Sequence, residues 1–312
     1  MSDVIQIGEP RDGREKQAVV QPRVRKREPG PRPDWLKVVY RRNDTFSAVR
    51  GIKERLNLVT VCEEARCPNI DECWSAGTAT FMLMGEVCTR RCGFCAVGKG
   101  TPGPLDINEP ENTAKAIAEL GVRHAVITTV NRDDLDDGGA AHFASTVRWI
   151  RKVSPSTRVE LLISDLMGSR DAVHTILEAG AHIVAHNTET VPRLYRRVKP
   201  KSDYGRTLNV LKWIHEWPDV VSKTGIMLGL GETDDEIESV MNDLRDVGCE
   251  ILSLGQYLSP STKHMGVDRW VSPDTFAHFA ELGRQLGFRH VEAGPLVRSS
   301  YMAHRPFADE QS

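Results

Sequence analysis

Three cysteines on one short loop carry the clearest chemistry in this sequence. Cys88, Cys92 and Cys95 are spaced C-x3-C-x2-C, and Gly93 relieves crowding between them, so the backbone can bring all three thiols to one metal centre. A [4Fe–4S] cluster normally takes four thiolates, so a set of three leaves one iron open to a ligand that is not protein. The loop lacks the fourth Cys or His that a zinc site of this spacing needs. The spacing therefore predicts an open iron–sulfur cluster, with zinc or unrelated reactive thiols as the alternatives.

A second set of three cysteines precedes the first. Cys62, Cys67 and Cys73 are spaced C-x4-C-x5-C, again without a fourth ligand nearby. A second iron–sulfur cluster is the simplest interpretation, and a zinc site completed by a distant histidine competes with it. The seventh cysteine, Cys249, begins an apolar run and is predicted to be a core residue. Six cysteines crowded together are typical of metal sites in a reducing compartment and not of scattered disulfides.

The composition sets broad limits on fold and partners. At 312 residues the chain can bury a full-sized core, and its 41 basic and 43 acidic residues leave no overall electrostatic bias toward nucleic acid or membrane. No apolar run approaches the roughly 20 residues that cross a bilayer. The N-terminus has acidic residues and lacks an apolar secretory segment. We therefore expect a cytoplasmic protein with no nucleic-acid or membrane partner.

The elements that position these loops follow a regular alternation. An apolar run over residues 78–87 predicts a buried strand that leads into the loop of Cys88. After it, β-branched apolar runs alternate with helical patterns, which predicts βαβ units and a parallel sheet. The predicted helices span residues 108–120, 139–153, 169–179, 202–216, 234–247 and 273–286, and the following strands span 124–130, 158–164, 182–185, 222–228, 250–256 and 288–291.

Six clear strands and one doubtful one are too few for a closed eight-stranded barrel. The sequence therefore predicts an α/β fold, a partial (β/α)6 TIM-like barrel with an N-terminal cluster-binding extension. The predicted regions are an extended polar arm (1–33), the extension with the second triplet (34–76), the barrel (77–292) and a C-terminal segment (293–312). In the extension, the apolar spacing from Phe46 to Leu56 predicts a helix with Asp44 as its N-cap.

The first triplet also has an aromatic residue, Phe94, directly before its last cysteine. This pattern resembles the radical S-adenosylmethionine (SAM) enzymes. In these enzymes the open iron chelates the methionine end of SAM, and an electron from the cluster splits SAM to give a 5′-deoxyadenosyl radical. The resemblance implies that Cys88, Cys92 and Cys95 are catalytic as well as metal ligands.

Polar and glycine residues follow several predicted strands, at the edge where a barrel places its site. They are Asn131 and Arg132 after the second strand, Asn187 and Glu189 after the fourth, and Met227, Gly229 and Glu232 along and after the fifth. An amide and a carboxylate two residues apart can hold the hydroxyls of a ribose, and glycines let the backbone approach a flat adenine. A solvated loop or an ordinary turn is the alternative for each. Their shared position beside the cluster loop favours SAM binding.

The C-terminal run Arg298-Ser299-Ser300-Tyr301 makes the resemblance more specific. Together with the two triplets it resembles the lipoyl synthase family, from about residue 35 to the end. The resemblance implies that the second triplet binds an auxiliary [4Fe–4S] cluster whose fourth ligand is Ser299 and whose sulfide is consumed. A serine alkoxide is a hard ligand on a soft iron–sulfur centre and is easily given up. The implied reaction inserts two sulfur atoms at C6 and C8 of a protein-bound octanoyl chain.

The resemblance also implies cofactors and partners. The cofactors are two [4Fe–4S] clusters and SAM. The partners are octanoylated lipoyl carriers, namely the glycine cleavage H protein and the E2 lipoyl domains of 2-oxo acid dehydrogenases, an electron donor such as ferredoxin or flavodoxin, and a cluster-repair carrier. The alternatives are a sulfur-inserting enzyme of the biotin synthase kind, which would lack the second triplet and the R-S-S-Y run, and a non-catalytic iron–sulfur or zinc protein.

Overall fold

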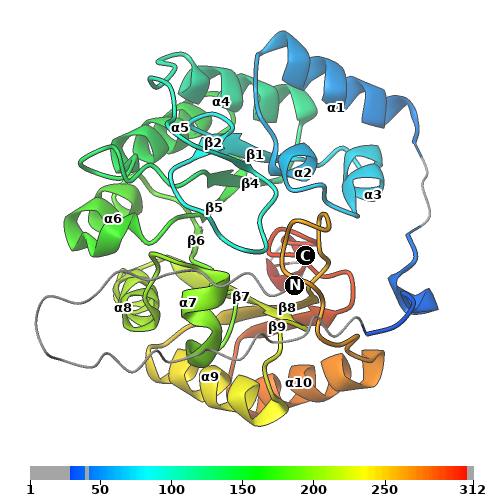
Figure 1. The fold of residues 1–312 in the computed structure, drawn as a ribbon. Helices are drawn as coiled ribbons and strands as arrows, with labels where there is room; N and C mark the ends of the chain where they lie inside the picture. The colour runs from blue at the N-terminus through cyan, green and yellow to red at the C-terminus, as the bar shows by residue number, and fades with distance from the viewer. Residues whose placement is uncertain (1–28, 39–41, 308–312) are drawn as a thin grey trace, which may run out of the picture.

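Seven strands form one parallel sheet in the part of the chain that the computed structural model describes, residues 29–38 and 42–307. The order is β1-β4-β5-β6-β7-β8-β9, so β1 and β9 are the two edges. Figure 1 shows this sheet curved, with helices around it. The strands are β1 (Thr80–Leu83), β4 (His124–Thr129), β5 (Arg158–Leu162), β6 (Ile183–Ala185), β7 (Val221–Leu228), β8 (Ile251–Gln256) and β9 (His290–Gly294). The predicted partial barrel is confirmed, and the doubtful last strand is present.

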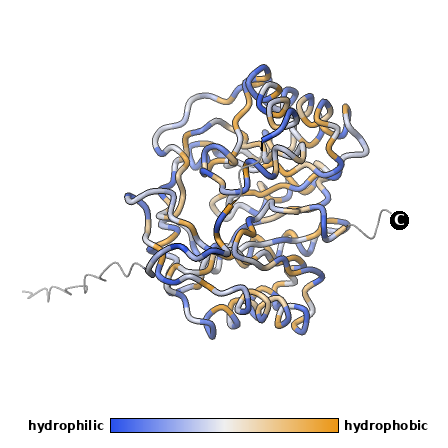
Figure 2. The backbone as a smooth tube through the Cα atoms, turned by 90° about the vertical axis from the view of Figure 1, so that its right-hand side faces the viewer, coloured by the Kyte–Doolittle hydropathy of each residue, from blue (hydrophilic) through white to orange (hydrophobic). Residues whose placement is uncertain are grey.

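Helices connect successive strands and cover the outer face of the sheet. They are α4 (Glu109–Leu120), α5 (Ala140–Val153), η2 (Leu166–Gly168), α6 (Arg170–Leu177), η3 (Pro192–Leu194), α7 (Tyr195–Val198), α8 (Tyr204–His215), α9 (Asp234–Asp246) and α10 (Pro273–Gln285). Figure 2 shows apolar and hydrophilic stretches alternating along the outer helices, as expected where one helix face packs on a core. None of the helices in the described part of the chain has the length and apolar character needed to span a bilayer.

The two faces of each strand have different neighbours. Ile226 and Leu254 belong to a buried apolar cluster with residues of α9 and α10 on the outer face. On the inner face, Lys223 donates to the buried Glu160 across the barrel at 2.6 Å. Because side chains alternate along a strand, Gly225 and Gly255 also face inward. The inner face of β7 and β8 is therefore left bare at these two glycines.

The first predicted strand is longer than the observed one. β1 ends at Leu83 and not at residue 87, because Met84 (φ 68°) and Gly85 (φ 86°) adopt left-handed backbone conformations that break the strand. The chain resumes in β2 (Val87–Cys88), which pairs with β3 (Gly98–Lys99) in a small separate sheet. These two short strands frame the loop of the first cysteine triplet.

The N-terminal extension packs helices against one edge of the barrel. It contains η1 (Asp34–Leu36), α1 (Asp44–Arg55), α2 (Val61–Glu64) and α3 (Ile70–Ser75). The predicted N-cap of α1 is wrong by one residue, since Asn43 accepts the hydrogen bond from the Phe46 N–H. Asn and Asp are comparable N-caps, so adjacent candidates cannot be ranked by residue type. The predicted arm, residues 1–33, lies outside the described residues except for 29–33.

The C-terminal segment turns back across the inner face of the barrel after β9. A Cβ on Gly225 would lie 3.2 Å from Ser299 Oγ, and a Cβ on Gly255 would overlap the carbonyl oxygen of Val297. The segment then reaches the opposite end of the strands, where Phe307 packs with Ile183. The bare glycines therefore provide the space that the segment occupies.

Candidate functional site

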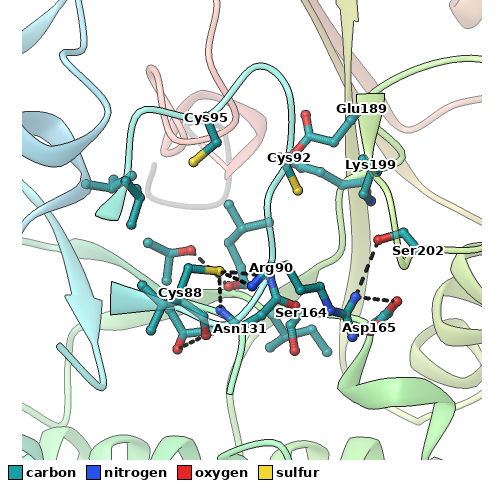
Figure 3. A pocket seen from close by; sticks show the side chains of 18 of the residues that line it. Cys88, Arg90, Cys92, Cys95, Asn131, Ser164, Asp165, Glu189, Lys199 and Ser202 are labelled. Atoms are coloured by element: carbon teal, nitrogen blue, oxygen red, sulfur yellow. Dashed lines mark hydrogen bonds and ion pairs between the residues drawn. The ribbon is translucent and has the colours of Figure 1, made fainter. Parts of the chain in front are cut away.

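A pocket at the carboxyl ends of the strands contains the first cysteine triplet (Figure 3). It encloses about 910 Å³ of free space, including its solvent-filled mouth. Its lining includes Cys88, Cys92, Cys95, Phe94, Asn131, Asn187, Glu189, Lys199, Asp165 and, from the N-terminal extension, Val61. The structure thus brings the triplet together with four other predicted site residues, Phe94, Asn131, Asn187 and Glu189.

The cluster loop is held by contacts that leave its thiols facing the pocket. Cys88 Sγ accepts from the backbone N–H of Arg90 (3.4 Å) and of Asn131 (3.3 Å). The N–H of Gly93 donates to the carbonyl oxygen of Val198 at 2.9 Å. A Cβ on Gly93 would lie 2.8 Å from the sulfur of Met265, so a larger residue would require this side chain to move. Gly93 thus avoids a clash with Met265, and the expectation that it relieves crowding between the cysteines stays a prediction.

The donor set is three thiols, the set that an open iron–sulfur cluster uses. In the described residues no three Cys, His, Asp or Glu side chains converge closely enough to hold one ion. A cluster binds each thiolate through a different iron, so its ligands stand farther apart. Burial raises the pKa of Cys92 to about 12 and also raises the pKa of Cys95. These thiols must therefore lose protons when they bind metal.

A buried arginine network ties the cluster loop to the barrel. Arg90 pairs with Asp133 at 2.8 Å and with Asp165 at 2.7 Å, which anchors the loop to the ends of β4 and β5. Burial alone would raise the pKa of Asp165, but the hydrogen bonds and charge of Arg90 lower it to about 2. The predicted site residue Arg132 pairs instead with its neighbour Asp134 at 2.8 Å. Sequence reasoning missed Arg90, although an arginine between two ligand cysteines must find a partner if buried.

A second polar group stands across the pocket from the cluster loop. Lys199, which sequence reasoning also missed, donates from Nζ to the backbone oxygen of Asn187 at 2.8 Å. Asn187 Nδ2 donates to Glu189 Oε1 at 3.1 Å. Burial lowers the pKa of Lys199 and raises that of Glu189, and each charge opposes the shift of the other. Glu189 has φ 68°, a strained value for a non-glycine residue and typical of a functional position.

Three predicted site residues lie along and after β7, beside this pocket and not in its lining: Met227, Gly229 and Glu232. The N–H of Met227 donates to the backbone oxygen of Glu189 at 2.9 Å, which places the end of β7 next to that carboxylate. Glu232 is buried, and its carboxylate accepts from the N–H groups of Gly229 (2.6 Å) and Leu230 (2.9 Å). Glu232 therefore shapes the glycine turn, and the contact of this turn with adenine stays a prediction.

The second cysteine triplet lies on the turn that contains α2 and α3. The N–H of Cys67 donates to the oxygen of Cys62 at 3.0 Å, which curls the chain between them. Burial, followed by the charges of neighbouring thiols of the triplet, raises the pKa of Cys62 to about 11 and that of Cys73 to about 12. The three thiols therefore lie near one another in a buried environment.

The C-terminal segment closes on this second triplet. The Asn69 amide donates to the backbone oxygen of Leu296 at 2.8 Å, and the Tyr301 hydroxyl donates to Glu72 at 3.2 Å. Burial raises the pKa of Cys67, and the charge of Arg298 opposes this effect, so Arg298 also lies near the triplet. Ser299 lies between these anchors, and its Oγ accepts from Asn187 Nδ2 at 2.7 Å. Ser299 therefore contacts a residue of the first pocket, while its neighbours in the chain contact the segment that carries the second triplet.

Comparison with known proteins identifies the class. The family described as "Radical SAM superfamily" matches residues 82–244. The crystal structure of methylornithine synthase has a similar fold, with a TM-score of 0.55 and 14% identity over 77% of this chain and 73% of that chain. The fold and the cysteine pocket define a radical SAM enzyme, with SAM and a [4Fe–4S] cluster as its cofactors.

The particular family follows from closer relatives. The lipoyl synthase of Caldanaerobacter subterraneus subsp. tengcongensis is 51% identical over 273 residues, which cover 87% of this chain and 95% of the relative. The lipoyl synthase of Rubrobacter xylanophilus is 51% identical over 279 residues, which cover 89% of this chain and 87% of the relative. The chain belongs to the lipoyl synthase family, and its substrate is a protein of the lipoyl-carrier type. The predicted resemblance is confirmed.

Proposed function

We infer that this chain inserts two sulfur atoms, at C6 and C8, into an octanoyl chain attached to a lysine of a carrier protein. One observation carries the proposal. The pocket of the first triplet is also lined by Val61, the neighbour of Cys62 in the second triplet. A substrate chain in this pocket would lie beside the first cysteine set and beside the segment that carries the second. In this assignment, residues 34–76 and 293–312 serve the sulfur donor, and residues 77–292 serve the radical chemistry.

The radical half of the site uses the first triplet. Cys88, Cys92 and Cys95 hold the open [4Fe–4S] cluster, and the N–H of Asn131 steadies the Cys88 sulfur. Asn187 and Glu189 take the ribose of SAM. The remaining predicted residues surround SAM. Phe94 forms part of the pocket wall, and Met227 and Gly229 contact the adenine. Glu232 and Arg132 hold the loops in which the SAM-binding residues lie.

The sulfur half of the site uses the second triplet. Cys62, Cys67 and Cys73 hold an auxiliary [4Fe–4S] cluster, with Ser299 as its fourth ligand. When bound, the two clusters and SAM supply the 5′-deoxyadenosyl radical that removes hydrogen from C6 and C8 and the sulfides that replace it. Ser299 suits a ligand that must depart, since alkoxide oxygen is a poor match for a soft centre.

The wall of the pocket suits an alkyl chain. Unactivated C–H bonds have no acidity for a base to exploit, so the protein contributes alignment and exclusion of water. Apolar side chains of the lining supply both, and they are Val61, Met82, Val97, Val130 and Leu162. They come from the extension and from the barrel, so the alkyl chain contacts both regions at once.

The partners follow from this reaction. We assign octanoylated lipoyl carriers as substrates, including the glycine cleavage H protein and the E2 lipoyl domains of 2-oxo acid dehydrogenases. Ferredoxin or flavodoxin supplies electrons, and a cluster-repair carrier restores the auxiliary cluster after each turnover. The cytoplasm, where these partners occur in bacteria, is the assigned compartment.

The decisive experiment is mass spectrometry of an octanoylated carrier peptide after anaerobic incubation with SAM and a reductant. We expect a product with two added sulfur atoms. Cys88→Ala should abolish SAM cleavage and product together, because no open cluster can form. An unchanged peptide with the wild-type enzyme, or full SAM cleavage by Cys88→Ala, contradicts the proposal.

A further inference from the structure

One amide group joins the two halves of the site. Asn187 lies at the end of β6 and lines the pocket of the first triplet. Its Nδ2 donates to Glu189 Oε1 at 3.1 Å and to Ser299 Oγ at 2.7 Å. A single side chain thus contacts both a proposed SAM ligand and the proposed departing ligand of the auxiliary cluster.

The surroundings fix the direction of this amide. Lys199, itself buried, donates to the Asn187 backbone oxygen at 2.8 Å, which holds the residue at the strand end. Both N–H groups of the side chain are directed to Glu189 and Ser299. The side-chain oxygen of Asn187 is buried without a hydrogen-bond partner among the described residues. The oxygen is therefore left for the ribose assigned above, while the N–H groups hold Glu189 and Ser299.

A glycine on the neighbouring strand makes the contact between Asn187 and Ser299 possible. A Cβ on Gly225 would lie 3.0 Å from Asn187 Oδ1 and 3.2 Å from Ser299 Oγ. Any larger residue would press on both side chains at once. The Asn187–Ser299 hydrogen bond therefore depends on a bare position in β7.

We propose that Asn187 is a positioning residue that competes with iron for the oxygen of Ser299. The proposal rests on the function above, in which Ser299 is a cluster ligand. On release from iron, the Ser299 oxygen would keep the electron pair of its bond and take a proton from a water molecule, whose hydroxide would take the vacated position on iron, so no oxidant or reductant is needed. The resulting hydroxyl is then held by the Asn187 amide, which favours departure of the serine.

The test measures how easily the auxiliary cluster loses iron. The full chain with Cys88, Cys92 and Cys95 all changed to Ala is reconstituted anaerobically, so that it carries the auxiliary cluster alone and SAM binding plays no part. Iron transfer to a coloured chelator is then followed by absorbance. In this background Asn187→Leu should slow iron loss about fivefold, the factor expected for one hydrogen bond of ordinary strength.

Two further variants make the result specific. Gly225→Ala should slow iron loss in the same direction, because its methyl group separates Asn187 from Ser299 without altering either. Ser202→Ala is the matched control, since Ser202 lines the same pocket but contacts Arg90 and not Ser299, and it should leave the rate unchanged. Iron loss that is unchanged or faster in both Asn187→Leu and Gly225→Ala overturns the proposal.

A fourth variant separates this inference from the proposed function. Ser299→Ala should speed iron loss if serine is a ligand. An unchanged rate in Ser299→Ala contradicts the ligand assignment itself. A faster rate in Ser299→Ala, with no slowing in the Asn187 and Gly225 variants, leaves the ligand assignment intact and rejects the role of Asn187.

Discussion

Serine and cysteine differ by one atom, and that atom decides how firmly a side chain holds iron in a cluster. Thiolate is the usual ligand of iron–sulfur centres, whereas serine oxygen is a harder donor. Position 299 therefore tests whether a weak ligand is needed for sulfur release. The neighbouring contacts, from Leu296 to Asn69 and from Tyr301 to Glu72, hold the backbone in place whichever side chain is present.

Ser299→Cys should keep the auxiliary cluster and lose sulfur insertion. The thiolate stays on iron, so the sulfide is not freed, while the first triplet still binds and cleaves SAM. We expect 5′-deoxyadenosine at near wild-type amounts and at least a tenfold drop in sulfur-containing peptide, the result of a step blocked by more than about 1.4 kcal/mol. Chromatography of both products checks this. Normal sulfur insertion in the variant would show that a labile ligand is not required.

At the scale of elements, the glycines of β7 and β8 decide whether the C-terminal segment can enter the barrel. Sequence alternation predicted these strands, because their apolar residues face helices. It did not predict why Gly225 and Gly255 are bare, since the segment that fills the space lies more than 40 residues away in the chain. Periodicity reports the local neighbours of a residue and not the distant chain that packs on it.

Gly255→Ala should displace the C-terminal segment and loosen the auxiliary cluster. The new methyl group would overlap the oxygen of Val297, two residues before Ser299. We expect the reconstituted variant to lose up to half of its iron, while its first cluster still cleaves SAM. Iron analysis and a SAM cleavage assay measure both properties.

The matched control is Gly51→Ala in α1. A Cβ there meets nothing within 4 Å, so we expect full iron content and a stability equal to or up to about 1 kcal/mol above wild type. Full iron content in Gly255→Ala would mean that the segment can shift without disturbing the cluster.

At the scale of the whole molecule, the buried charges and histidines set the response to pH. His186 is buried at the end of β6, with Nδ1 3.0 Å from the oxygen of Ile163 and Nε2 3.3 Å from Thr207 Oγ1. Burial, followed by the charge of Lys199, lowers its pKa to about 4. The folded chain therefore keeps this ring neutral at pH values where the unfolded chain protonates it.

This histidine should make the fold less stable as the pH falls. Because the unfolded state binds the extra proton below about pH 6.5, the unfolding free energy should drop by about 2 kcal/mol between pH 7.5 and 5. Urea unfolding under anaerobic conditions measures the change. His186→Gln should lose most of this dependence, and an equally steep drop in that variant would assign the effect to other groups.

The barrel and the cysteine pocket were predictable because their signals are local. Strand and helix alternation and the spacing of Cys88, Cys92 and Cys95 need only neighbouring residues. The partners of Arg90 were not predictable, since Asp133 and Asp165 lie on other loops and meet Arg90 only in the folded chain. Ser299 entered through family resemblance, because nothing in the spacing of a serine marks it as a ligand.

The end of the described chain has a practical consequence. The ring of Phe307 lies beneath the guanidinium groups of Arg158 (4.4 Å) and Arg289 (5.1 Å), at the amino ends of the strands. The mouth of the pocket opens at the carboxyl ends. Immobilising the enzyme on a bead through this end of the barrel, beside Phe307, would thus present the entrance to the bulk liquid, where a bulky acylated domain can dock freely.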